Sequence, residues 1–114
     1  MNKDNDISLP KRAWNEDSLI KYARVGGTVM EGSTNPTVTK KEFVVTDDGR
    51  YFVQIVLSSA IVKRASQPVG VEEFLLLLDV GDYLISNGRT SMAGGFRYDK
   101  QPDGSWDTIV AWRS

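Results

Sequence analysis

The 114-residue sequence contains no cysteine and no histidine. The absence of cysteine excludes disulfides, thiolate nucleophiles, iron–sulfur clusters and cysteine-based zinc sites. The absence of histidine excludes serine–histidine and cysteine–histidine catalytic arrangements, and it removes the commonest ligand of transition metals. The chemistry that remains uses carboxylates, lysine, tyrosine, serine or threonine, and a bound metal would be a hard cation with oxygen ligands. We expect no cofactor.

An excess of charge and a long apolar segment are also missing. The chain has 14 basic and 15 acidic residues, a formal net charge of −1. It therefore lacks the positive charge that drives binding to phosphate backbones, so nucleic acid is disfavoured as a partner. The longest apolar run, residues 74–78, is far shorter than the roughly 18 residues of a membrane span, and the first residues lack the apolar core of a secretory signal. We expect a cytoplasmic protein with no membrane partner.

The composition is that of one globular domain, since 40% of the residues are hydrophobic and 25% are charged. Residues 1–13 are polar and include Leu9-Pro10, so they are expected to form an N-terminal arm. Residues 14–114 are expected to form a single α+β domain. Its predicted architecture is an antiparallel sheet of about five strands with two helices packed on one face.

The strongest local pattern is a β-hairpin from Lys40 to Arg64. Runs rich in Val, Ile, Phe and Tyr flank Asp48-Gly49, which is a typical two-residue hairpin turn. A turn of that length places Val44 opposite Val53. Both faces of the hairpin are then partly apolar. One face is a candidate interface or ligand cavity, but cover by sheet curvature, loops and long lysine side chains is the favoured interpretation.

A first helix is predicted over residues 15–25. Asn15 is a good N-cap, acidic residues follow it in the first turn, and Gly26-Gly27 provides the stop.

The segment from residue 71 to residue 87 is ambiguous. Its leucine content, its acidic start and Asn87-Gly88 at its end favour one helix, bent near Gly81. The alternative is two strands, residues 73–79 and 83–86, joined by a turn at Gly81. The next residues, 87–95, contain three glycines and are expected to form a mobile loop. A second hairpin then joins residues 96–98 to 106–112.

Three acidic pairs are candidate catalytic or metal sites. Asp47-Asp48 lacks the rest of a calcium-binding loop, so ordinary turn chemistry is favoured. Asp79 and Asp82 are three residues apart and would share one face of a helix, but nothing in the sequence indicates burial or a raised pKa. The neighbours Glu72 and Glu73 point about 100° apart on a helix and do not converge. Solvated helix residues are the favoured interpretation of both glutamates and of Asp79 and Asp82.

The remaining polar patterns are also ambiguous. Residues 88–95 hold the glycines, arginine and hydroxyls of an anion-binding loop, yet they do not match a phosphate-binding P-loop, and a flexible connector is favoured. The basic pairs Lys40-Lys41 and Lys63-Arg64 are interpreted as charges that protect sheet edges from pairing.

No motif identifies a family. The predicted order of elements resembles that of small bacterial secretion chaperones, although the final helix that those chaperones use to dimerise is not evident. The leading hypothesis is a non-enzymatic protein-binding domain of bacterial or phage type, such as an immunity protein, an inhibitor or a chaperone. The expected partner is a protein or a second copy of the chain. The candidate partner-binding residues are Trp14, Arg89, Met92, Arg97, Trp106 and Trp112.

Two alternatives remain open at this point. One is a small-ligand-binding protein or enzyme with a pocket between a curved sheet and a helix. The possible pocket residues are Tyr22, Tyr51, Tyr83 and Arg97. The other is a self-assembling structural component of a phage or mobile element. A deep enclosed pocket favours the ligand-binding class, whereas a filled interior with an exposed apolar patch favours the protein-binding class.

Overall fold

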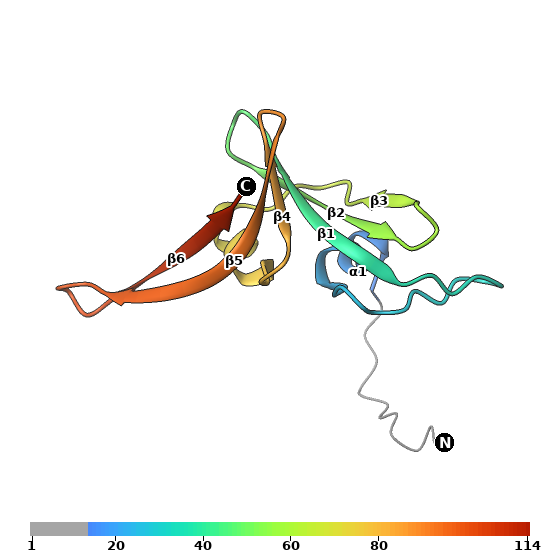
Figure 1. Cartoon of the computed structure of the whole chain (residues 1–114), viewed down its shortest axis with the longest axis horizontal. Helices are drawn as coiled ribbons and strands as arrows, with labels where there is room; N and C mark the ends of the chain where they lie inside the picture. Colours follow the sequence, from blue (N-terminus) through green and yellow to red (C-terminus); the bar gives the residue numbers. More distant parts are fainter. Residues whose placement is uncertain (1–13) are drawn as a thin grey trace, which may run out of the picture.

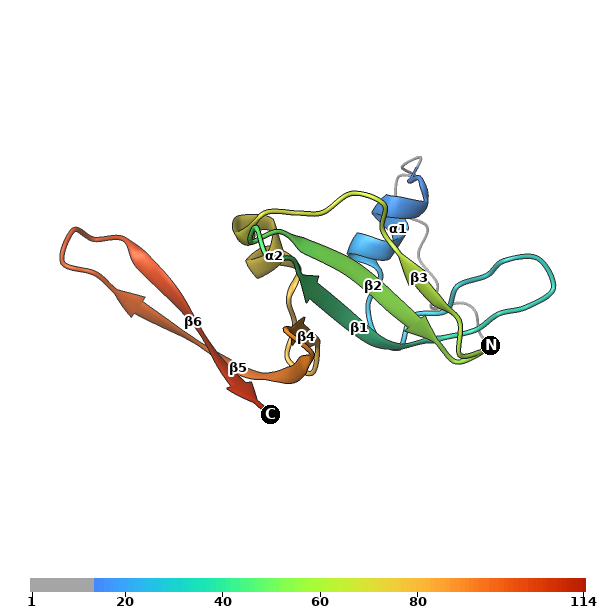
Figure 2. The same cartoon turned by 90° about the horizontal axis from the view of Figure 1, so that it is seen from above.

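The computed structural model describes residues 14–114, and the predicted N-terminal arm, residues 1–13, lies outside this range. The predicted α+β class is confirmed, but the sheet has six strands and not about five (Figures 1 and 2). The elements are α1 (Glu16–Tyr22), β1 (Val38–Val45), β2 (Tyr51–Leu57), β3 (Val62–Arg64), α2 (Val71–Leu77), β4 (Tyr83–Ser86), β5 (Arg89–Lys100) and β6 (Trp106–Arg113). Their order across the sheet is β3-β2-β1-β4-β5-β6.

The expectation of a purely antiparallel sheet was wrong for one pair of strands. β1 and β4 run parallel, with Phe43 beside Leu84, and the other neighbouring strands are antiparallel. Parallel neighbours need a crossover connection, and α2 lies within the one between them.

The prediction of one helix over residues 71–87 was also wrong, whereas the alternative strand at 83–86 is present. α2 ends at Leu77, and Gly81 then adopts a φ of +94° in a turn that the Asp82 N–H closes on the Asp79 carbonyl at 3.0 Å. A helix cannot contain that backbone conformation, but the third position of a type II turn requires it. The turn therefore ends the helical segment, and β4 begins directly after it.

The predicted mobile loop at residues 87–95 is mostly strand β5. Asn87 and Gly88 have φ angles of 52° and 76°, and Ser86 pairs with Arg89 across them. Positive φ at both central residues is the requirement of a type I′ hairpin turn. Asn87-Gly88 is thus the turn between β4 and β5, and it does not cap a helix.

The β1–β2 hairpin forms where it was predicted, but its register differs by one residue. Phe43, and not Val44, lies opposite Val53. Because side chains alternate along a strand, this slip moves Phe43 and Lys41 into the core and places Val44 on the opposite face.

The cause of the slip is the length of the turn. The N–H of Thr46 bonds to the carbonyl of Arg50 at 2.9 Å, so three residues form the loop and only Gly49 among them has positive φ. The β5–β6 turn has the same geometry, since the Gln101 N–H bonds to the Ser105 carbonyl at 2.7 Å. Both turns end in Asp-Gly, and both are three-residue loops with glycine in the left-handed position.

The core contains an aromatic cluster around Phe74 of α2. The Phe74 ring stacks on Tyr51 at 4.1 Å between ring centroids, and it meets Phe43 edge-on at 5.0 Å. Ile20 of α1 is fully buried in the same core, as are Phe43 and Ile55. The distal part of the β5–β6 hairpin projects beyond this core (Figure 1). The Cα radius of gyration, 16.2 Å, accordingly exceeds the about 13 Å expected for a compact domain of this length.

Long polar side chains cover much of the sheet face that carries Val44. Arg64 lies over the Phe52 ring at 4.8 Å, Lys40 lies over the Tyr83 ring at 5.4 Å, and Gln54 donates to Glu42 at 2.7 Å. Long side chains therefore lie over aromatic rings on this face, which agrees with the interpretation that side chains cover the second face of the sheet. Within residues 14–114, no helix has the length and apolar character to cross a membrane.

Candidate functional site

Two grooves that share residues flank α2. The larger, which we call the hairpin groove, has a volume of about 750 Å³, and the smaller, the helix groove, about 420 Å³. The hairpin groove is lined by Arg24, Leu75, Leu76, Leu78, Asp79, Val80, Phe96, Tyr98 and Thr108. The helix groove is lined by Trp14, Lys21, Tyr22, Arg24, Lys41, Leu76, Leu77 and Asp79.

The hairpin groove presents apolar side chains to solvent. Leu76 of α2 is 86% exposed, Val80 is 60% exposed and Tyr98 of β5 is 62% exposed. Tyr98 pairs with Thr108 of β6, so one face of the hairpin forms one wall of the groove. Exposed apolar side chains are common one by one, but their concentration in a concave surface is typical of an interaction site.

The helix groove combines aromatic and positively charged side chains. The rings of Trp14 and Tyr22 lie 5.6 Å apart, and Lys21 and Arg24 flank them. Arg24 forms a 3.8 Å ion pair with Asp79 at the boundary between the two grooves. Both partners are largely exposed, so this pair contributes little stability and is available for exchange with a ligand.

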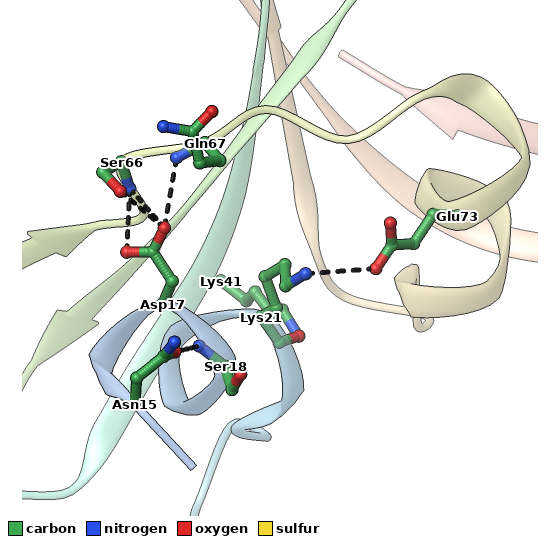
Figure 3. A network of polar contacts seen from close by, with 8 residues as sticks. All are labelled: Asn15, Asp17, Ser18, Lys21, Lys41, Ser66, Gln67 and Glu73. Carbon is green, nitrogen blue, oxygen red and sulfur yellow. Dashed lines mark hydrogen bonds and ion pairs between the residues drawn. The ribbon is translucent and has the colours of Figure 1, made fainter.

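A polar network fixes α1 beside the helix groove (Figure 3). The carboxylate of Asp17 accepts hydrogen bonds from the Ser66 N–H at 2.9 Å, the Ser66 hydroxyl at 2.6 Å and the Gln67 N–H at 3.2 Å. The Ser66 hydroxyl, followed by these backbone N–H groups, lowers the pKa of Asp17. Lys21 donates to Glu73 of α2 at 3.4 Å, so α1 is linked both to α2 and to the segment before it.

The start of α1 agrees with the sequence-based prediction. Asn15 is the N-cap, and its side chain accepts a 2.8 Å hydrogen bond from the Ser18 N–H. The helix ends at Tyr22, three residues earlier than predicted.

Lys41 caps the C-terminal end of α1. Its side chain is only 4% exposed, and Nζ donates to the carbonyls of Lys21 and Ala23. These carbonyls belong to the last turn of α1, where helical partners are missing and a cation is favourable. Burial lowers the pKa of Lys41. The interpretation of Lys40-Lys41 as edge protection was wrong, because β1 lies inside the sheet between β2 and β4.

Replacing Lys41 with Met is expected to lower the free energy of unfolding by about 1–2 kcal/mol, because two buried carbonyls lose their donor. Lys40→Met is the matched control, since the neighbouring residue is exposed, and we expect a change within about 0.5 kcal/mol. Urea denaturation followed by circular dichroism measures both. Equal effects of the two variants would contradict the capping role.

Asp82 is a buried acid that lines neither groove. It is 3% exposed, and its carboxylate accepts the Asp79 N–H at 2.9 Å. Burial raises the pKa of Asp82 to about 6. Asp79, in contrast, is exposed and paired with Arg24. The interpretation of Asp79 and Asp82 as solvated helix residues was wrong, because neither lies in a helix and Asp82 is buried. The hydrogen bond between them stabilises the turn before β4.

The other acidic and basic candidates have structural partners. Asp48 accepts hydrogen bonds from the Thr46 hydroxyl and from Arg50 Nε, which confirms the turn interpretation. Lys63 lies within 3.8 Å of Glu16 and 3.6 Å of Glu31. Within residues 14–114, no three potential metal-ligating side chains gather into a site.

The predicted partner-binding residues are spread over the molecule. Only Trp14 lines a groove. Trp106 and Trp112 lie on β6, and Arg97 donates to Asp99 at 2.9 Å on the hairpin. Arg89 is exposed at the start of β5, and Met92 is half-buried in it.

The predicted ligand-pocket residues are not brought together either. Tyr22 lines the helix groove, but Tyr51 stacks on Phe74 in the core. Tyr83 and Arg97 line neither groove.

Sequence analysis missed the groove residues Leu76, Val80 and Tyr98. A signal was present for Leu76, because four consecutive leucines occupy residues 75–78. Successive positions on a helix point about 100° apart, so one of the four must face solvent.

These features define an α+β fold with a projecting hairpin and two open grooves beside α2. No family model, curated protein or solved structure matches this chain.

Proposed function

We propose that this protein is a non-enzymatic protein-binding domain of bacterial or phage type, acting as an immunity protein, an inhibitor or a chaperone. The observation that carries the proposal is the hairpin groove, where Leu76, Val80 and Tyr98 are all more than half exposed. The cytoplasmic location expected from the sequence remains part of this proposal.

The filled interior supports a protein partner over a small molecule. Phe43, Val53 and Ile55 are completely buried at the centre of the sheet, and both grooves are open at the surface. Small-molecule sites are more enclosed, with polar groups that converge on the ligand.

The side chains around the grooves indicate the chemistry of the partner. The hairpin groove suits apolar side chains, and the adjoining helix groove presents Lys21 and Arg24. We therefore propose a partner surface with apolar residues flanked by carboxylates, which would bind the arginine that now pairs with Asp79.

The proposal includes the predicted packing of both helices on one face of the sheet. Two contacts support it, because Lys41 of β1 binds the end of α1 and Phe43, two residues further on, contacts Phe74 of α2. Residues two apart on a strand point to the same face.

The experiment is a comparative capture from a lysate of the encoding organism, followed by a titration. The bait is the full chain, a double variant (Leu76→Ser with Tyr98→Ser), or the control Met30→Ser. Met30 is 77% exposed and lines neither groove. We expect one stoichiometric partner for the native chain and the control. Calorimetry with that purified partner should show binding at least about tenfold weaker for the double variant.

Circular dichroism and thermal unfolding verify that each bait is folded. Capture that the double variant retains at full strength would contradict the groove as the binding site. A folded native chain that captures no protein would contradict the proposed function. Trp112 is unsuitable for this test because its ring also stacks on Phe74, at 6.5 Å.

A further inference from the structure

The two outer edges of the sheet differ in how they are protected. β3, at one edge, has three residues, two of which are Lys63 and Arg64. β6, at the other edge, has eight residues, and it contains neither proline nor lysine. Short length, lysine, proline and bulges are the usual protections against pairing with another chain, and the irregularity next to β6 lies in β5, between Ala93 and Gly95. The β6 edge is therefore open to strand pairing.

The β5–β6 turn determines which backbone groups of β6 are free. Gln101 and Ser105 form the first hydrogen-bonded pair after the turn. Hydrogen-bonded and non-hydrogen-bonded pairs then alternate, so odd-numbered residues of β6 up to Ala111 bond to β5. The pairing has a bulge between Ala93 and Gly95 of β5. Both backbone groups of Ala93 bond to residues 81 and 82, so Trp112, which lies opposite Ala93, does not bond to β5. The N–H and C=O groups of residues 106, 108, 110 and 112 consequently point away from the sheet.

The charged residues of β6 indicate which strand can pair with this edge. We propose that β6 pairs antiparallel with β6 of a second copy of this chain, centred on Val110. In this register Asp107 of each copy lies opposite Arg113 of the other, and Thr108 lies opposite Trp112. The free N–H and C=O groups of one β6 strand then face those of the other, and about six backbone hydrogen bonds join the two copies. Two neighbouring registers also bring the free backbone groups together. One places Asp107 opposite Ala111, and the other places Arg113 opposite Ile109. Neither register forms the two ion pairs between Asp107 and Arg113.

The single chain leaves these two charges without partners. Asp107 lies directly opposite Asp99 of β5, and like charges in that position are unfavourable. Within residues 14–114, neither Asp107 nor Arg113 forms an ion pair. Arg113 lies over Gly94 in the single chain, and because it is exposed it reaches the second copy by rotation of its side chain.

The pairing has a consequence for the grooves. Antiparallel strands related by a twofold axis perpendicular to the sheet keep the same face up in both copies. Thr108 lines the hairpin groove, so the two hairpin grooves would open on the same side of one continuous sheet. The dimer would therefore present two binding sites to one partner surface. This inference concerns self-association, and it stands or falls independently of the proposed function.

Charge reversal tests both the dimer and its register. Sedimentation velocity across a range of protein concentrations should show a dimer with a dissociation constant in the micromolar range, as expected for a small interface. Asp107→Arg alone and Arg113→Asp alone should each weaken it at least about tenfold, because like charges then meet twice. The double variant should restore the native constant.

A mixture of the two single variants gives the sharpest result. Each variant repels itself but complements the other at both positions, so a one-to-one heterodimer is expected by native mass spectrometry. A monomer at every concentration, a dimer that is insensitive to the single reversals, or the absence of the heterodimer would overturn the proposal. Both residues are exposed, so the substitutions should leave the fold intact, and circular dichroism of each variant tests this.

Discussion

Replacing Phe74 with Ala should lower the free energy of unfolding by about 3–5 kcal/mol. Phe74 is 4% exposed and is the buried anchor of α2. The substitution removes the stack on Tyr51 and the edge contact with Phe43, and a helix of seven residues is too short to keep its place without packing. We therefore expect α2 to detach, and both grooves to be lost with it.

The matched control is Leu76→Ala, two residues further along the same helix. Leu76 is 86% exposed, so its truncation should change the free energy of unfolding by less than about 0.5 kcal/mol. Urea denaturation measures both variants, and hydrogen exchange of residues 71–77 reports on α2 directly. A similar small effect of the two substitutions would show that Phe74 does not anchor the helix.

The stability of the native protein should fall as the pH rises from 5 to 7.5. The folded state raises the pKa of Asp82 from 3.8 to about 6, so between these values the folded chain holds a proton that the unfolded chain has released. The contribution of this proton to the free energy of unfolding is largest below pH 3.8, and it is lost as the pH rises through about 6. The whole change is about 3 kcal/mol, and roughly half of it falls between pH 5 and 7.5.

Burial is the main cause of the raised pKa of Asp82, whereas the positive charge of Lys41 lowers this pKa and the Asp79 carboxylate raises it. The chain has no histidine, whose ordinary pKa lies near 6.5, and unperturbed carboxyl groups titrate near 4. The pKa values of four other carboxyl groups are lowered, chiefly by side-chain hydrogen bonds: those of Asp17, Asp48, Asp99 and Asp103. These groups titrate below pH 5, and there they make the stability increase as the pH rises.

Urea denaturation of the native chain and of Asp82→Asn at pH 5, 6 and 7.5 measures the effect. The variant should show a flat profile, because asparagine does not titrate and still accepts the Asp79 N–H. Asp79→Asn, at an exposed neighbouring position, should keep a falling profile that lies at slightly lower pH, because the Asp79 charge raises the pKa of Asp82. A native profile that is flat, or that rises with pH, would contradict the burial of a protonated Asp82.

Local sequence signals predicted the elements whose geometry is set by a few neighbouring residues. Asn15 caps α1 as expected, since an N-cap needs only the next three residues. Asp48-Gly49 and Asp103-Gly104 both lie in hairpin turns. What these signals did not determine was turn length, because the same dipeptide fits a two-residue and a three-residue loop.

The errors between residues 71 and 95 share one cause. Leucine-rich composition favoured a helix through to residue 87, although Gly81 and Asn87-Gly88 are both turn signals. Pairing of β4 with β1 on one side and β5 on the other overrides the weak helical preference of residues 83–86. Propensity alone could not reveal this, because the partner strand β1 lies about 40 residues earlier in the chain.

The sequence by itself determined the α+β class, the exclusion of cysteine and histidine chemistry, the start of α1 and the location of two hairpins. These follow from composition and from contacts between near neighbours. Only the tertiary structure decided the register of β1, the parallel position of β4, the burial of Lys41 and Asp82, and the grooves beside α2. Each of these depends on residues distant in sequence, such as Asp17 with Ser66 or Lys41 with Ala23, whose contacts exist only when the chain has folded.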